Sequence, residues 1–335
     1  MNKTISELGE IKLIERLLDK RDKTLSNINP QILASYHDDA AIELNTSTYT
    51  VISTDMLIEH THFPKNMTHY QMGEKIVTVN VSDIISMNAI PSAIVISMAL
   101  NPNMTVEEFD DMIDGILHKC EEYGITLIGG DLNQNEEIIL SATAMGKINK
   151  NIKLQSNIND NDLIAITGEL GSPAAGLDLL NSDDKIDIPL EEEEKIIKTI
   201  LEPNLPIKES EYFQKYPEII SSMTDITDGL AAELGHLREK NPELGFEIEF
   251  NNIPFNSYLP HVARHFNKSL NYYLLHFGEE FELLLTIKEK EYLKHKKELD
   301  GLIYIIGKVN TSKNLTLIKD NSIEIIEARG YEHLK

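Results

Sequence analysis

The chain of 335 residues is poor in cysteine and in basic side chains, and each shortage excludes a class of structure. Its single cysteine, Cys120, rules out an internal disulfide and suits a reducing compartment. The formal net charge of -24 provides no basic surface of the kind that nucleic acid requires, so we expect no nucleic-acid partner. No apolar run reaches the roughly 18 residues that a membrane span needs. The amino terminus leads into a charged segment rather than a signal peptide. We therefore expect a cytoplasmic protein with no membrane partner.

Helical and strand-like segments alternate along the chain in two halves, separated by the polar, asparagine-rich stretch 149–161, which is the best linker candidate. Thr105 and Glu108 have the spacing of a capping box at a helix start. The pattern predicts an α+β fold with two domains, 1–150 and 151–335, in which helices flank mixed sheets. The segments with the clearest patterns are expected strands at 49–53, 92–100, 125–128, 138–148, 163–167 and 219–224, and expected helices at 73–88, 105–123, 190–201 and 207–215.

Isolated aspartates recur at the ends of apolar runs, and this is the most informative pattern in the chain. An aspartate in that position must be paired or must hold a cation, because a bare anion is costly in an apolar layer. Almost no lysine or arginine stands beside these aspartates, which favours cations. Mg2+ takes oxygen ligands, keeps several waters and bridges to substrate phosphates. The pattern therefore indicates an enzyme that handles a polyphosphate through several Mg2+ ions. The five places are 37–41, 53–55, 80–83, 129–131 and 223–229.

Each motif also has a simpler explanation when it is taken alone. Asp38-Asp39 fits a polar turn or a helix N-cap, and 53–55 fits a turn at a strand end. Asp83 is expected on a largely apolar helix face, where burial demands a partner. The segment 129–131 is more specific, because its glycines allow a backbone to approach a ligand while Asp131 reaches a metal. The segment 225–229 places three oxygen side chains at a strand-to-helix turn, for which an N-cap is the alternative.

In order and spacing these motifs resemble the thiamine-monophosphate kinase family, of the aminoimidazole-ribotide-synthetase-like ATP-binding superfamily. The resemblance runs from about residue 35 to Tyr331. It implies that superfamily's two-domain α+β fold and a homodimer, formed by pairing of the N-terminal sheets, with the ATP sites near the interface. Besides the aspartate motifs, it rests on the segments 53–63, 75–83, 167–177, 278–284 and 330–333.

The resemblance implies transfer of the ATP γ-phosphate onto the phosphate of thiamine monophosphate, which gives thiamine diphosphate. No dedicated base is expected, because a phosphate oxygen is already a nucleophile, and positioning with charge stabilisation supplies most of the catalysis. Gly130, Asp131 and Thr227 are expected against ATP. The residues expected against thiamine monophosphate are His62, Glu279 and Tyr331. The residues expected to hold Mg2+ are Asp39, Ser53, Thr54, Asp55, Asp83, Asp131, Asp225 and Asp228.

The chain departs from the family pattern at several positions, which marks it as a divergent member. Histidines replace the usual glycines at His37 and His60. Gln155 stands where the family has an arginine that would contact ATP phosphates, and 277–282 alters the family's Gly-Gly-Glu-Asp-Tyr-Glu. Two alternatives therefore stay open: a superfamily enzyme with another acceptor, such as a purine precursor or selenide, and a non-catalytic nucleotide-binding paralogue. The sequence contains no Walker loop, so a P-loop kinase is not supported.

Overall fold

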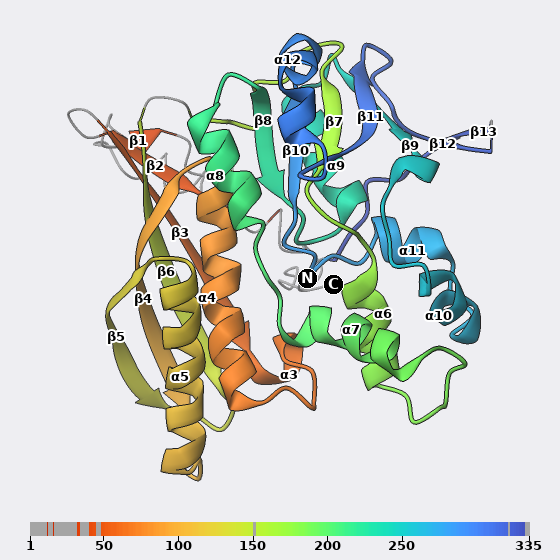
Figure 1. Ribbon diagram of the computed structural model, residues 1–335. Helices are drawn as coiled ribbons and strands as arrows, with labels where there is room; N and C mark the ends of the chain where they lie inside the picture. Colours follow the sequence, from red (N-terminus) through yellow and green to blue (C-terminus); the bar gives the residue numbers. More distant parts are fainter. Residues whose placement is uncertain are drawn as a thin grey trace, which may run out of the picture.

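The computed structural model describes residues 12, 16, 32–33, 40–44, 48–149, 152–320 and 322–331. Two mixed β-sheets stand side by side with helices packed on their faces (Figure 1). This arrangement confirms the predicted α+β class. One sheet is built from the residues before the 149–161 stretch and the other from the residues after it; we call these parts the N-terminal and C-terminal halves.

The N-terminal sheet has six strands, of which β4 and β5 are parallel and the other neighbours antiparallel. Two helices, α4 (His69–Ser86) and α5 (Val106–Glu122), cover one face, and the short α3 (Glu59–His62) follows β3. The predicted capping box at α5 is confirmed, since Thr105 and Glu108 each accept a backbone N–H of the other. The strand order is β1 (Ile32–Leu33), β2 (Ala41–Leu44), β3 (Tyr49–Ile58), β6 (Ile139–Ile148), β4 (Ile90–Leu100) and β5 (Thr126–Gln134).

The C-terminal sheet has seven strands, and only its β12–β9 pair is parallel among the strand pairs described. Its strand order is β13 (Ser322–Ile325), β12 (Leu315–Lys319), β9 (Gly245–Glu249), β11 (Tyr304–Asn310), β7 (Leu163–Ile166), β10 (Leu283–Ile287) and β8 (Ile220–Asp225). Its helices are α6 (Ser172–Leu180), α7 (Leu190–Leu201), α8 (Ile207–Lys215), α9 (Leu230–Lys240), α10 (Leu259–His265), α11 (Leu270–Leu275) and α12 (Glu289–Leu299), with a 3-10 turn at Phe250–Asn252.

Helix α4 joins the two halves through a shared core. One face of the C-terminal sheet packs under α6, α9, α10 and α11. The other face, with Met223 and Leu285, belongs to the same hydrophobic core as Ile76 and Val81 of α4. Because α4 packs against both β3 and β8, side chains from the two sheets meet along this helix.

Two strands run further than the sequence indicated. Residues 53–55 were expected to end a strand, but β3 continues to Ile58. The strand expected to be short and buried at 125–128 is instead β5, which passes through Gly129-Gly130-Asp131 and is largely exposed. Both predictions were wrong because the polar and glycine residues were taken as punctuation, whereas strand pairing with β6 and β4 carries the backbone through them.

The single cysteine is buried within a helix. Cys120 lies in α5, where burial raises the pKa of its thiol to about 11, so it is an inert buried thiol at neutral pH. Across the part of the chain that the structure describes, no helix combines the length and the apolar character needed to cross a membrane.

Candidate active site

A cavity of about 530 Å3 opens between the two halves, beside α3 and α4. Apolar side chains, including Phe63, Val79 and Phe277, form part of its wall. Residues from both halves reach it, so the site depends on the whole fold. The predicted site residues that line it are Asp55, His62, Asp83, Thr227, Asp228, Glu279 and Tyr331.

Asp55 and Asp83 form the acidic part of the wall, where β3 packs against α4. The Ser53 hydroxyl donates to Asp83, and the backbone N–H of Asp55 donates to the side-chain oxygen of Asn80 at 3.0 Å. Burial raises the pKa of Asp55, and a hydrogen bond with Asp83 opposes that rise. Two carboxylates this close require a shared proton or a cation between them. The donor set therefore fits a divalent cation.

Asp225 lies behind this wall at the end of β8. It is buried and accepts a hydrogen bond from the Ser82 hydroxyl, which ties α4 to the C-terminal sheet. Burial raises its pKa to about 7, and the nearby charges of Glu233 and Asp55 add to that effect. Asp225 is thus a carboxyl whose ionisation requires a compensating charge.

Three segments of the C-terminal half converge on the cavity. Gly278 has φ of 104°, and a Cβ there would lie 2.1 Å from the carbonyl oxygen of Thr227, so glycine is required. The next residue, Glu279, donates its backbone N–H to the same oxygen at 2.8 Å. The backbone N–H of Tyr331 donates to the carbonyl oxygen of Asp228 at 3.2 Å. These bonds place Glu279, Thr227, Asp228 and Tyr331 on one side of the cavity.

His62 approaches from the N-terminal half at the end of α3. Its Nδ1 lies 2.9 Å from the backbone nitrogen of Ile58 and 3.3 Å from the carbonyl oxygen of the same residue. In the tautomer that makes the shorter contact, Nδ1 accepts the N–H of Ile58 and the ring carries its proton on Nε2. That Nε2–H is a donor suited to a phosphate oxygen.

Lys75, which the sequence analysis did not assign to the site, also lines the cavity. The feature of the sequence that could have indicated its role is a lysine among the apolar residues Met72, Ile76 and Val79 of α4.

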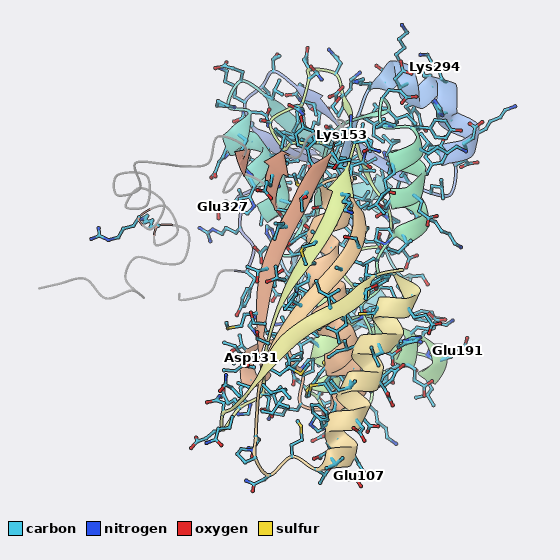
Figure 2. The ribbon with its side chains drawn as sticks, turned by 90° about the vertical axis from the view of Figure 1, so that its left-hand side faces the viewer. Glu107, Asp131, Lys153, Glu191, Lys294 and Glu327 are labelled. Carbon is cyan, nitrogen blue, oxygen red and sulfur yellow. The ribbon has the colours of Figure 1, made fainter. Side chains whose placement is uncertain are left out.

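Thr54 and Asp131 lie on the other face of the N-terminal sheet, away from the cavity. Alternate residues of β3 point to opposite faces of the sheet, so the Thr54 side chain points away from the face that carries Asp55. The Thr54 hydroxyl donates to the carbonyl oxygen of Ala142 at 2.6 Å. Asp131 pairs in register with Ser97, is exposed, and accepts from the Asn133 amide at 2.8 Å. Figure 2 shows this face with Asp131. The metal roles of these two side chains stay predictions.

Gly130 has a packing explanation in the structure. A Cβ at this position would lie 1.9 Å from the carbonyl oxygen of Ile96, so the close approach that it permits is to strand β4. Its predicted place against ATP stays a prediction. Asp39, predicted as a metal ligand, lies outside the described residues.

Gln155 is buried and bonded to a cation. Its side-chain amide donates to the Thr224 hydroxyl at 3.0 Å, and its side-chain oxygen accepts from the Lys240 ammonium. A positive charge therefore already lies beside the position at which the family resemblance predicts an arginine.

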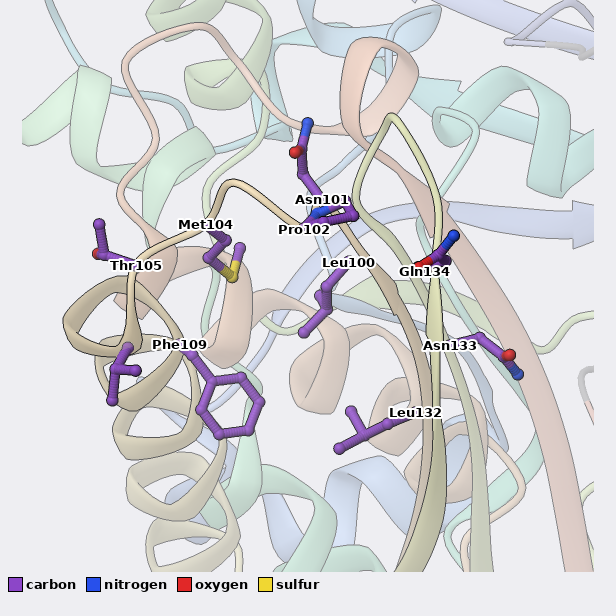
Figure 3. A pocket seen from close by; sticks show the side chains of 10 residues that line it. Leu100, Asn101, Pro102, Met104, Thr105, Phe109, Leu132, Asn133 and Gln134 are labelled. Carbon is purple, nitrogen blue, oxygen red and sulfur yellow. The ribbon is translucent and has the colours of Figure 1, made fainter.

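A second hollow, of about 430 Å3, lies at the far end of the N-terminal sheet between β5 and the start of α5. Figure 3 shows Phe109 and Leu132 there, with Met104 near them. None of the predicted site residues lines it. The cavity between the halves is therefore the candidate active site.

Comparisons with known proteins identify relatives of this chain. Residues 36–148 match the family model described as AIR synthase related protein, N-terminal domain. The chain is 32% identical over 301 residues to a thiamine-monophosphate kinase of Pyrococcus abyssi, covering 90% of this chain and 91% of that protein. It is also 32% identical over 335 residues to the thiamine-monophosphate kinase of Buchnera aphidicola subsp. Schizaphis graminum, covering 98% and 99%.

The solved structures give the same result for the fold. The structure of AaThiL complexed with AMPPCP and TMP superimposes with a TM-score of 0.85, at 25% identity, covering 99% of both chains. Sequence identity at this level along nearly the full length of two kinases, together with a shared fold, places the chain in the thiamine-monophosphate kinase family.

Proposed function

We propose that this protein transfers the γ-phosphoryl group of ATP to the phosphate of thiamine monophosphate, producing thiamine diphosphate and ADP. The observation that carries the proposal is the single cavity in which carboxylates of the N-terminal half face Thr227, Asp228, Glu279 and Tyr331 of the C-terminal half. Family membership and the likeness to a structure complexed with AMPPCP and TMP support it.

The acceptor is proposed to bind against His62, Glu279 and Tyr331. The Nε2–H of His62 suits the acceptor phosphate, and the aromatic face of Tyr331 suits the cationic thiazolium ring. The apolar wall, with Phe63 and Phe277, provides contact area for the rest of the heterocycle. These three groups come from distant parts of the chain, and their common position on one cavity is the support for this arrangement.

The donor is proposed to bind against Gly130, Asp131 and Thr227, with several Mg2+ ions. Of these three residues, only Thr227 lines the cavity. Among the described residues, no group of three or more carboxylate, imidazole or thiolate side chains is arranged to hold a metal ion by itself. Mg2+ commonly takes one or two carboxylates and completes its shell with waters and substrate phosphates, which suits the Asp55–Asp83 pair. When bound, the ions neutralise phosphate charge. The ligands proposed are Asp39, Ser53, Thr54, Asp55, Asp83, Asp131, Asp225 and Asp228.

The reaction needs positioning more than acid–base chemistry. An oxygen of the acceptor phosphate attacks the γ-phosphorus, the bond from that phosphorus to the β,γ-bridging oxygen breaks, and ADP departs with the bond's electron pair. The residues proposed for the two substrates would hold the two phosphates in line and exclude water. No side chain is required to remove a proton, because the attacking oxygen is ionised at neutral pH.

The helix-free face of the N-terminal sheet is proposed to form a homodimer interface. Asp131 is on this face, and Met56 and Ile90 are 53% and 58% exposed there. Pairing of two such faces would cover these apolar side chains and bring Asp131 toward a second copy.

The proposed domains are 1–150 and 151–335, which places the boundary between β6 and β7. ATP as co-substrate and the buried Cys120 thiol suit the cytoplasm, which is the compartment we propose.

The test is purified protein with ATP, Mg2+ and thiamine monophosphate, followed by chromatographic separation of thiamine diphosphate. We expect thiamine diphosphate and ADP in equal amounts. ATP binding without turnover would favour the non-catalytic paralogue that the loss of the family arginine at Gln155 suggests. Turnover with a different acceptor, and none with thiamine monophosphate, would favour another superfamily activity.

A further inference from the structure

Lys75 is a charged side chain in an almost fully buried position. Its side chain is 1% exposed, although it lies on α4 within the shared core. A buried ammonium is costly unless it is paired and hydrogen-bonded. Its Nζ donates to the carbonyl oxygen of His62 at 2.9 Å and to Glu279 Oε2 at 2.5 Å. The lysine therefore depends on two partners, and each of them belongs to the proposed acceptor site.

These partners come from opposite sides of the cavity. His62 ends α3 in the N-terminal half, and Glu279 follows Gly278 in the C-terminal half, 204 residues after Lys75. Lys75 reaches both from α4, the helix that also presents Asp83 to the cavity. One ammonium thus fixes the relative position of two segments that must act on the same ligand.

Glu279 needs such support for both conformation and charge. Its φ is 60°, a left-handed conformation that a side chain other than glycine rarely adopts. Its carboxylate is 29% exposed at a cavity that also carries Asp55, Asp83 and Asp228. An uncompensated carboxylate here would repel an anionic acceptor, and the Lys75 ammonium offsets that charge at a charge-assisted hydrogen bond.

We propose that Lys75 is a positioning residue for the acceptor: it holds the Glu279 carboxylate and the His62 backbone in the arrangement that binds thiamine monophosphate. This inference rests on the proposed function and adds a residue that specifies acceptor binding. Lys75 acts through Glu279 and His62.

The test compares Lys75→Met, Glu279→Gln and the double variant in steady-state kinetics with each substrate varied in turn. Lys119→Met is a matched control, because Lys119 is 4% exposed on the neighbouring helix α5, pairs with Glu122 at 2.8 Å, and does not line the cavity. We expect Lys75→Met to raise the KM for thiamine monophosphate by about tenfold or more and the KM for ATP by less than about twofold. The double variant should lose no more than the worse single variant, since each change breaks the same contact.

Melting temperatures separate positioning from general stability. Lys119→Met and Lys75→Met should both lower the melting temperature, but only Lys75→Met should change the KM for thiamine monophosphate. The inference is overturned if the two lysine variants have the same kinetics, if both KM values rise together, or if the effects of Lys75→Met and Glu279→Gln multiply in the double variant. If the wild-type protein turns over thiamine monophosphate and the Lys75→Met variant has the same kinetics, this inference alone is overturned. A wild-type protein without that turnover overturns the proposed function and this inference with it.

Discussion

Replacement of Tyr331 by alanine tests the acceptor site at a residue whose loss should leave the fold intact. Tyr331 is 53% exposed and lines the cavity, so it is not a core aromatic. A cation on an aromatic face contributes about 0.5–1 kcal/mol at exposed sites and about 2 kcal/mol when desolvated. Loss of that contact corresponds to an increase of about 2- to 30-fold in the KM for thiamine monophosphate. The KM for ATP should change little, and Tyr331→Phe should be milder because the ring remains.

The assay is steady-state kinetics with each substrate varied in turn, accompanied by thermal unfolding. Tyr304→Ala is a suitable control, since Tyr304 is 41% exposed on β11 and does not line the cavity. We expect both alanine variants to keep melting temperatures near that of the wild type. The reasoning is refuted if Tyr331→Ala weakens both substrates equally with a marked loss of stability, or if it leaves the KM for thiamine monophosphate unchanged.

Three further predictions concern the metals, the nucleotide and pH. Asp228→Asn keeps the shape of the side chain but removes a charge. We expect its turnover to fall by more than about tenfold at every Mg2+ concentration, with an unchanged circular dichroism spectrum. Wild-type rates for this variant would contradict the metal role. Gln155→Arg should lower the free energy of unfolding by about 1–3 kcal/mol in urea titrations, because it places a second cation against Lys240 in a buried position. Unchanged stability together with tighter ATP binding would show that this position accepts an arginine that contacts the nucleotide. Burial raises the pKa of Glu282 from its ordinary value of 4.5 to about 7. The folded state therefore binds more protons than the unfolded state between these values, and stability should fall as pH rises from about 4.5 to 7. Glu282→Gln should flatten part of that fall, and an unchanged pH profile of the melting temperature would contradict the assigned shift.

The sequence predicted elements whose signals are local. The bounds of α7 and α8 match the expected helices at 190–201 and 207–215, and the α5 capping box depends on two residues three apart. The lengths of β3 and β5 were not predictable in the same way. Pairing with β6 and β4 determines them, and Gly130 is explained by the backbone of Ile96 in a neighbouring strand.

The candidate site was predicted as a set of residues, but its contacts were not. Seven of the residues expected from the family resemblance line the cavity, among them Asp83 and Glu279. Gly130, Thr54 and Asp131 do not line it, and the resemblance did not state what holds any of these residues in place. The contacts of Lys75 with Glu279 and of Gln155 with Lys240 join residues 204 and 85 positions apart, so no local pattern indicates them. Tertiary packing along α4 brings the first pair together, and a position on the linker segment beside α9 brings the second.

The most direct test of the central claim is the fate of the γ-phosphate when labelled ATP meets thiamine monophosphate on this protein. If the phosphoryl group passes directly from ATP to thiamine monophosphate, the label should appear in the terminal phosphate of thiamine diphosphate in a 1:1 ratio to the ADP formed. Asp83→Asn should slow this transfer. Label released chiefly as free phosphate, or ADP formed at the same rate without thiamine monophosphate, would contradict the account.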